Sequence, residues 1–323
     1  MRTWTVCAAA VVLVGAAAGG WIGLRGDGPN AFGQASGDAV SSADARAAVA
    51  DRLDLPWPDE GQASIEVEGL GKLGATAGQR PLPIASVTKV MTAYVILKEH
   101  PLADGEQGPA VAVDAAAAQE SHSLTESTAP LREGQRLSER RMLELLLLPS
   151  GNNVARLLAR WDAGSQQAFV AKMNRAARDL GMHRTTYTGA SGLEATTRST
   201  ADDQLKLARQ TMKDPTLRAV VAMRSTTVPG EPDPVVNTNR LLDRPGVVGL
   251  KTGSSTPAGG ALMWAAEAGT GGKRHFVLGV VLGQRAGTTP AEGLEAAFEK
   301  SGALIDAVQK ELPAALGEQG DRT

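Results

Sequence analysis

The chain has 323 residues, enough for one large domain or two small ones with a sizeable core. Its 33 basic and 35 acidic residues nearly balance, which gives no reason to expect a nucleic-acid partner. A single cysteine, Cys7, excludes an internal disulfide framework, and the scattered histidines lack metal-ligand spacing, so we expect no metal and no cofactor.

The N-terminal segment carries the pattern of an export signal. Residues 4–24 contain no charged side chain and follow Arg2, and this length can span a bilayer as a signal-anchor. Three alanines at 16–18 also offer a small-residue cleavage site. We expect residues 1–24 to be a signal peptide or signal-anchor and residues 25–44 to be a flexible linker rich in Gly, Ser, Asp and Ala. The protein is then extracytoplasmic, either secreted or attached to the membrane through this segment.

Few elements are expected before residue 137. A short helix is predicted over 45–55, a strand over 63–70 and a second strand before Pro81. An apolar helix begins around Ser86 and ends near His100. Residues 102–136, rich in Ala and Ser, are expected to be irregular.

From residue 137 the pattern is helical and then changes to strands. Ser138 is the expected N-cap of an apolar helix that stops at Pro149, and another helix is expected near Val154. Further helices are predicted over 166–180, ending at Gly181, and over 200–212, with Ser199 or Thr200 as the N-cap. Three strands (247–253, 261–266 and 276–282), an amphipathic helix (292–312) and a polar tail (313–323) complete the chain.

Strands at both ends and helices in between predict an α/β fold of the α+β type. An antiparallel sheet would be assembled from the N- and C-terminal segments, flanked by helices, with a helical lobe inserted. We expect residues 45–312 to form this catalytic domain.

The stretch around Ser86 carries the clearest chemical signal. Ser86 stands at the head of an apolar helix, and Lys89 follows three residues later. Positions i and i+3 share one face of a helix, so the lysine amine can reach the serine hydroxyl. An adjacent amine of lowered pKa can take the hydroxyl proton and make the serine a nucleophile. Alone, this four-residue pattern is weak evidence, because it occurs by chance in many chains.

Two further motifs make the signal specific. Ser150-Gly151-Asn152 lies in a predicted connection between helices, and Lys251-Thr252-Gly253 lies in a predicted strand. Each of the three patterns occurs once, in this order. The combination Ser-x-x-Lys, Ser-x-Asn and Lys-Thr-Gly is the signature of penicillin-binding proteins and class A β-lactamases.

The chain resembles the serine D-alanyl-D-alanine carboxypeptidases, the low-molecular-mass penicillin-binding proteins with a β-lactamase-like fold. The likeness runs from about residue 60 to 310 and includes the residues around the three motifs (83–93, 147–152 and 251–259) and three connecting stretches (180–182, 191–193 and 199–202). The chain departs from the family pattern at Asn153, where aspartate is common, at Ser255, where threonine is usual, and at residues 188–190.

The resemblance implies the reaction and the role of each residue. The enzyme would remove the terminal D-alanine from peptidoglycan stem pentapeptides through an acyl-enzyme on Ser86, and β-lactam antibiotics would inhibit it. Lys89 would be the general base, with its pKa lowered by a second cation, Lys251. Ser150 would relay a proton to the leaving D-alanine, and Asn152 would orient Lys89 and the substrate amide. Substrate binding falls to Lys251 and Thr252, which suit the terminal carboxylate, and to Ser254, whose N–H would form the oxyanion hole with that of Ser86.

Two alternatives remain at this point. A class A β-lactamase would share the fold, but it would need a Glu-x-x-Leu-Asn segment after the second motif, and none occurs between Asn152 and Lys251. A non-catalytic penicillin- or peptidoglycan-binding sensor is disfavoured because every expected catalytic side chain is present. Arg285 is a further candidate for a carboxylate contact, although a solvated loop arginine is the more common case. His122 is assigned no role.

Overall fold

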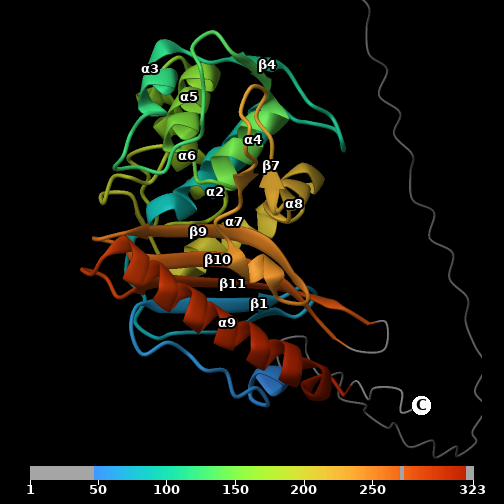
Figure 1. Ribbon diagram of the computed structural model, residues 1–323. Helices are drawn as coiled ribbons and strands as arrows, with labels where there is room; N and C mark the ends of the chain where they lie inside the picture. The colour runs from blue at the N-terminus through green and yellow to red at the C-terminus, as the bar shows by residue number, and fades with distance from the viewer. Residues whose placement is uncertain (1–46, 270–272, 318–323) are drawn as a thin grey trace, which may run out of the picture. The chain divides into compact units, whose positions relative to one another are not determined.

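The computed structural model describes residues 47–269 and 273–317 (Figure 1). The expected signal segment over 1–24, the linker over 25–44 and the end of the polar tail lie outside the described residues. No helix in the described ranges is both long and apolar enough to cross a membrane.

A five-stranded antiparallel sheet is the centre of the fold (Figure 1). Its spatial order is β2-β1-β11-β10-β9, so strands from the two ends of the chain pair directly, with Gln62 opposite Leu282. This confirms the expectation of a sheet built from N- and C-terminal segments. The strands are β1 (Gln62–Val67), β2 (Gly71–Ala75), β9 (Val247–Ser255), β10 (Gly259–Ala268) and β11 (His275–Gln284).

Both faces of the sheet are covered, because alternate side chains of its strands point to opposite sides. On β10, Met263 packs into the core shared with the helical lobe, whereas Trp264 packs into the core under α9 (Pro290–Ala315). The helix α9 lies across the front of the sheet in Figure 1. Burial on both faces explains why the central strands β10 and β11 are almost continuously apolar.

The helical lobe lies between β2 and β9 along the chain. Most of it lies beside the β9 edge of the sheet, and α7 (Ala201–Thr211) packs against β11 and β1 on the face opposite α9 (Figure 1). Its core is apolar and continuous with one face of the sheet. The longer helices are α2 (Thr88–Glu99), α4 (Glu139–Leu147), α5 (Asn152–Ala163), α6 (Gln166–Asp179) and α7 (Ala201–Thr211). The shorter helical elements are η1 (Ala85–Val87), α3 (Ala115–Glu120), α8 (Pro215–Val221) and η2 (Arg240–Asp243). Three two-stranded pairs complete the lobe: β3 (Leu82–Pro83) with β6 (Arg198–Ser199), β4 (Ala110–Ala112) with β5 (Arg136–Ser138), and β7 (Ser225–Thr226) with β8 (Val235–Val236).

Several local predictions are confirmed by the capping contacts. Ser138 caps α4 by accepting a hydrogen bond from the Arg141 N–H, and Thr200 caps α7 in the same way from Asp203. Gly181 follows α6 with a positive φ of 70°. These helix ends were predictable because the capping side chain acts locally.

Other local predictions were wrong in detail. The helix expected over 45–55 ends at residue 50 among the described residues. The region expected to be irregular contains β4 and α3, which are too short to show a hydrophobic period. The last helix is longer than the expected 292–312, and Pro313 lies inside it near its end. Ser86 lies in the 3₁₀ turn η1 instead of the α-helix itself.

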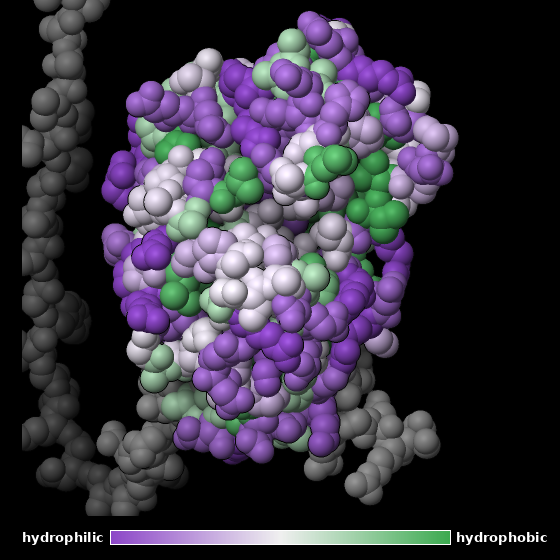
Figure 2. Space-filling view, turned by 60° about the vertical axis from the view of Figure 1, so that its left-hand side comes forward, coloured by the Kyte–Doolittle hydropathy of each residue, from purple (hydrophilic) through white to green (hydrophobic). Residues whose placement is uncertain are grey.

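Hydrophilic residues cover most of the surface seen in Figure 2, and apolar residues form small separate groups. Among the described residues, the large apolar side chains that are exposed are Leu124, Leu193 and Val236. Such single exposed side chains are normal on a protein surface and need no partner.

Candidate active site

Ser86 is positioned by the sharp entry into α2. The turn η1 precedes α2, and Ala85 has a positive φ of 46°, an uncommon conformation for a residue other than glycine. The helix that follows is apolar and buried on most sides. Ser86 in η1 and Lys89 in the first turn of α2 are therefore placed three residues apart, on a turn and helix that pack into the buried core.

Lys89 lies at the centre of the site and is fully buried. Its Nζ is 2.9 Å from the Ser86 Oγ, 2.6 Å from the Asn152 Oδ1 and 2.7 Å from the Ser191 carbonyl oxygen. The Ser191 carbonyl is held by Gly192, whose φ is +81° and where a Cβ would overlap the carbonyl oxygen of Ala85. Only glycine fits this close approach.

The surroundings of Lys89 favour its neutral form. Burial is the main cause that lowers its pKa well below the ordinary value, and the positive charges of Lys251 and Arg156 lower it further. A neutral amine has two N–H groups and one lone pair. The Asn152 and Ser191 oxygens can only accept, so they take the two N–H groups. The lone pair is left for the Ser86 hydroxyl, which is the geometry of a general base.

The second motif contributes two residues with different surroundings. Asn152 is the first residue of α5, so it is not confined to the interhelical connection as expected, and its N–H donates to the Ser127 carbonyl at 2.8 Å. Ser150 has a positive φ of 66°. Its Oγ is buried and has no hydrogen-bond partner among the described residues. A buried hydroxyl without a partner is costly and is typical of a functional position.

The third motif lies on the edge strand β9, next to the turn that carries Ser86. A Cβ on Gly253 would be 2.9 Å from the backbone nitrogen of Ser86, so the two segments are in close contact. Lys251 is buried, its Nζ donates to the Thr252 carbonyl at 2.9 Å, and burial lowers its pKa to about 7. Ser254 is half-buried two positions beyond Thr252 and pairs with Gly260 of β10.

A network of charged residues lies behind Asn152 and was not predicted from the sequence. The Asn152 Nδ2 donates to the Glu126 Oε2 at 3.0 Å, and the Arg156 Nη2 donates to the same oxygen at 2.9 Å. The Arg156 Nε also bonds Glu120 at 2.9 Å. Glu126 and Arg156 belong to no motif, so only the fold brings them to the site.

Two departures from the family pattern now have a structural account. Asn153 is buried, and its amide forms hydrogen bonds to the loop that follows α3. It accepts from the Ala129 N–H at 3.0 Å and donates to the Ala129 carbonyl at 2.9 Å and to the Ser121 Oγ at 2.9 Å. An aspartate could not donate these bonds. Ser255 accepts from the Ala258 N–H at 3.2 Å, a turn contact that a threonine hydroxyl can also make.

The remaining candidates lie apart from these contacts. Arg285 is exposed after β11, and its backbone N–H donates to the Glu60 Oε1 at 3.1 Å. His122 is exposed in the loop after α3. Thr238, which sequence analysis did not single out, contacts Thr252 through their hydroxyls at 2.7 Å.

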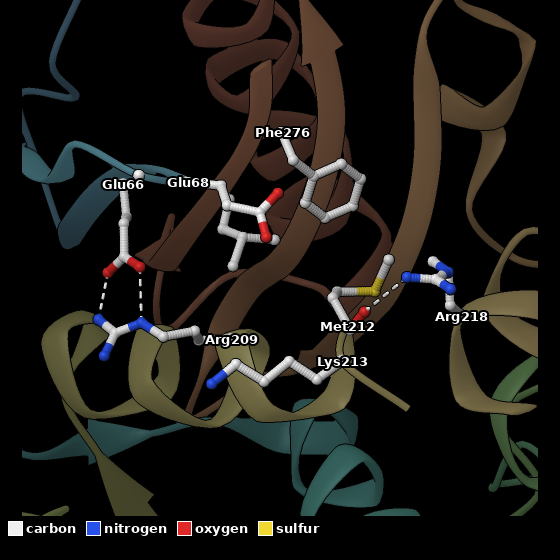
Figure 3. Close-up of a pocket in the computed structure, with 9 residues that line it drawn as sticks. Glu66, Glu68, Arg209, Met212, Lys213, Arg218 and Phe276 are labelled. Carbon is white, nitrogen blue, oxygen red and sulfur yellow. Dashed lines mark hydrogen bonds and ion pairs between the residues drawn. The ribbon is translucent and has the colours of Figure 1, made fainter. Parts of the chain in front are cut away.

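A separate pocket of about 220 Å³ lies where β1 and β11 approach the end of α7 (Figure 3). The Arg209 guanidinium pairs with the Glu66 carboxylate on one side, and Arg218 donates to the Met212 carbonyl on the other (Figure 3). None of its lining residues is a predicted site residue. These contacts account structurally for the charges of Glu66, Arg209 and Arg218.

Comparison with known proteins gives consistent matches. Residues 72–286 match the model of the peptidase S11 family, D-alanyl-D-alanine carboxypeptidase. The D-alanyl-D-alanine carboxypeptidase of Streptomyces sp. strain K15 is 35% identical over 213 residues, which are 61% of this chain and 71% of the relative. The carboxypeptidase DacB2 of Mycobacterium tuberculosis is 33% identical over 62% of this chain and 67% of its own.

Solved structures show the same fold. The crystal structure of the Streptomyces K15 DD-transpeptidase aligns with a TM-score of 0.65 and 29% identity, covering 78% of this chain and 98% of that one. Penicillin-binding protein 6B from Escherichia coli aligns with a TM-score of 0.66 and 30% identity, covering 80% of each chain. With its sheet order, its three motifs brought together at Ser86 and a family match over most of the described residues, this chain belongs to the D-alanyl-D-alanine carboxypeptidases of peptidase family S11.

Proposed function

We propose that the protein is a serine-type carboxypeptidase that removes the terminal D-alanine from peptidoglycan stem pentapeptides. The observation that carries the proposal is the set of three contacts of the Lys89 amine, two to acceptor oxygens and one to the Ser86 hydroxyl. Peptidoglycan lies outside the cytoplasmic membrane, so this function requires export of the domain.

In the first half of the reaction, the Lys89 lone pair takes the proton of the Ser86 hydroxyl while the Oγ attacks the carbonyl carbon of the penultimate D-alanine. The backbone N–H groups of Ser86 and Ser254 stabilise the oxyanion, an effect worth several kcal/mol of barrier in enzymes of this kind. The peptide C–N bond then breaks. The leaving amine receives the proton through the Ser150 hydroxyl, which is buried and has no other partner in the described structure.

In the second half, D-alanine diffuses away and water takes its place. Lys89 accepts a proton from this water as the oxygen attacks the ester carbonyl. The ester C–O bond breaks, the Ser86 Oγ regains a proton, and the shortened peptide leaves. One water is consumed and one D-alanine is released in each cycle.

Lys251 and Thr252 bind the terminal carboxylate of the peptide. With its pKa lowered to about 7 by burial, Lys251 is only partly charged at neutral pH. A bound carboxylate favours the charged form and raises that pKa again. Substrate binding above pH 7 is therefore accompanied by proton uptake.

The test is release of D-alanine from a pentapeptide that ends in D-Ala-D-Ala, compared with covalent labelling by a fluorescent penicillin. Both should require Ser86, and Ser86→Ala should abolish both without unfolding the protein. Full labelling of Ser86→Ala would remove this residue from the nucleophile role. Wild-type protein that binds wall peptide but never releases D-alanine would support the sensor alternative.

A further inference from the structure

Asn152 lies between Lys89 and Glu126 and presents one end of its amide to each. Its Oδ1 is 2.6 Å from the Lys89 Nζ, and its Nδ2 is 3.0 Å from the Glu126 Oε2. The two ends of an asparagine amide have nearly the same shape but opposite hydrogen-bonding character, so shape alone does not fix which end faces the lysine. An ionised carboxylate only accepts, so the end that faces Glu126 has to be the NH2 group.

The orientation matters for the chemistry of Lys89. With Oδ1 toward it, Lys89 donates one N–H to Asn152 and another to the Ser191 carbonyl, and its lone pair is left for Ser86. With the amide reversed, an N–H of Asn152 would point at Lys89 and compete for that lone pair. The lysine would then be a poorer acceptor for the Ser86 proton.

We propose that Glu126 is a positioning residue, which fixes the Asn152 amide and through it directs the Lys89 lone pair to Ser86. This inference rests on the proposed role of Lys89 as the base. Glu126 lies outside all three sequence motifs.

Glu126 is itself held in place and kept charged. Arg156 donates to the same carboxylate oxygen at 2.9 Å. Partial burial acts to raise the pKa of Glu126, but the hydrogen bonds from Arg156 and Asn152 outweigh it and hold the pKa below its usual range. The loop directly after Glu126 is held to the start of α5, because Asn152 donates its N–H to the Ser127 carbonyl and the Asn153 amide bonds the Ala129 backbone. The carboxylate is thus an ionised acceptor at neutral pH.

The test measures the rate constant of acylation by a fluorescent penicillin. Glu126→Ala should lower it about tenfold to a hundredfold, the size expected when a hydrogen bond to a charged group is lost. Glu126→Gln keeps the shape and one acceptor oxygen, so its loss should be smaller, about threefold to tenfold by the same reasoning. Glu120→Ala is the matched control, because Glu120 also pairs with Arg156 but does not contact Asn152.

Comparing the two variants separates orientation from charge. The charged groups that act on Lys89 are Lys251, Arg156, Glu194 and Glu126 itself. Both substitutions remove the same negative charge, which lowers the pKa of Lys89 and moves the acid limb of the acylation profile to lower pH. If charge were the whole role, the two variants would acylate at equal rates. A clearly slower alanine variant is the result expected from orientation.

In an Asn152→Asp protein, Glu126→Ala should have the opposite effect on the acylation rate. Asn152→Asp replaces the amide with a group that accepts at both ends, so there is no orientation left to fix, and it faces Glu126 with a like charge. Adding Glu126→Ala to Asn152→Asp should therefore raise the acylation rate above that of Asn152→Asp alone. A purely structural role of Glu126 would lower the rate in both backgrounds.

The outcomes are decisive in either direction. Acylation within twofold of the wild type in Glu126→Ala, or in Glu126→Gln if the alanine variant does not fold, would overturn the inference. So would a further loss in the Asn152→Asp background. The proposed function fails separately, through full labelling of Ser86→Ala measured in parallel.

Discussion

Replacing Glu139 with glutamine should make the protein more stable at pH 8 and leave it almost unchanged at pH 4.5. Glu139 is fully buried at the start of α4, and neither carboxylate oxygen has a hydrogen-bond partner among the described residues. A Cβ on Gly108 would be 3.0 Å from one of these oxygens, so the loop closes over the carboxylate. Burial, and then the charge of Glu106, raise the pKa of Glu139 from 4.5 to about 7.

The direction of the pH effect on stability follows from how many protons the folded and unfolded states bind. Between pH 4.5 and about 7 the folded protein keeps a proton on Glu139 that the unfolded chain releases, so the free energy of unfolding falls as pH rises through this window. At about 1.4 kcal/mol per pKa unit, the loss above pH 7 reaches roughly 3 kcal/mol. Glutamine has a similar shape and cannot ionise, so Glu139→Gln should avoid the loss.

The assay is urea denaturation of both proteins at pH 4.5, 6 and 8. The difference in unfolding free energy should grow from near zero at pH 4.5 to about 3 kcal/mol in favour of the variant at pH 8. Glu106→Gln, which removes the neighbouring exposed charge only, should keep most of the wild-type pH dependence. A difference that is the same at every pH, or a variant less stable than the wild type at pH 8, would refute the reasoning.

Three predictions concern the site. Gly253→Ala should slow penicillin acylation about a hundredfold, because the new Cβ would lie 2.9 Å from backbone nitrogens of η1 and push β9 away from Ser86. Gly302→Ala is the control and should acylate normally, because its Cβ would meet only the flexible end of Arg244 at 3.3 Å. The KM for peptide should rise with pH above about 7 while kcat stays constant, because substrate binding then requires protonation of Lys251. Lys251→Arg should remove this pH dependence of KM with some loss of affinity. A wild-type KM that does not change up to pH 9 would contradict the prediction. Penicillin should acylate Ser86 and leave slowly, since no glutamate-bearing β-lactamase segment follows the second motif; rapid catalytic hydrolysis in a spectrophotometric assay would instead favour a β-lactamase.

The parts of the fold that the sequence predicted are those whose signal is local. The C-terminal strands β10 and β11 are long and apolar. Ser138 and Thr200 are N-caps of α4 and α7, which begin at the next residue. The motif order also predicted that Ser86, Lys89 and Asn152 share a site, and in the structure the lysine amine contacts both partners. Their catalytic roles stay predictions until the variants are assayed.

The parts that could not be predicted depend on contacts between distant segments. Glu126 meets Asn152 across 26 positions of sequence, and nothing in its neighbours distinguishes it from a solvated loop carboxylate. The hydroxyl of Thr238 reaches Thr252 only because the segment after β8 returns to β9. Burial of Lys251, which decides its protonation, is likewise a property of the packed sheet.

The strand order has a consequence for how the enzyme becomes active during folding. Strand β1 cannot complete its pairing until β11, near the other end of the chain, has joined it on the side away from β2. Ser86, Lys89 and Asn152 all lie within the helical lobe, whose segments lie between β2 and β9 along the chain, but Lys251 joins them only on β9, at the far edge of the sheet from β2. Closing such long loops is slow, because chain entropy is lost before the pairing contacts form. We therefore expect nascent or truncated chains to be inactive. Activity should appear in the same folding step that pairs β11 with β1 and so removes the open edge of β1.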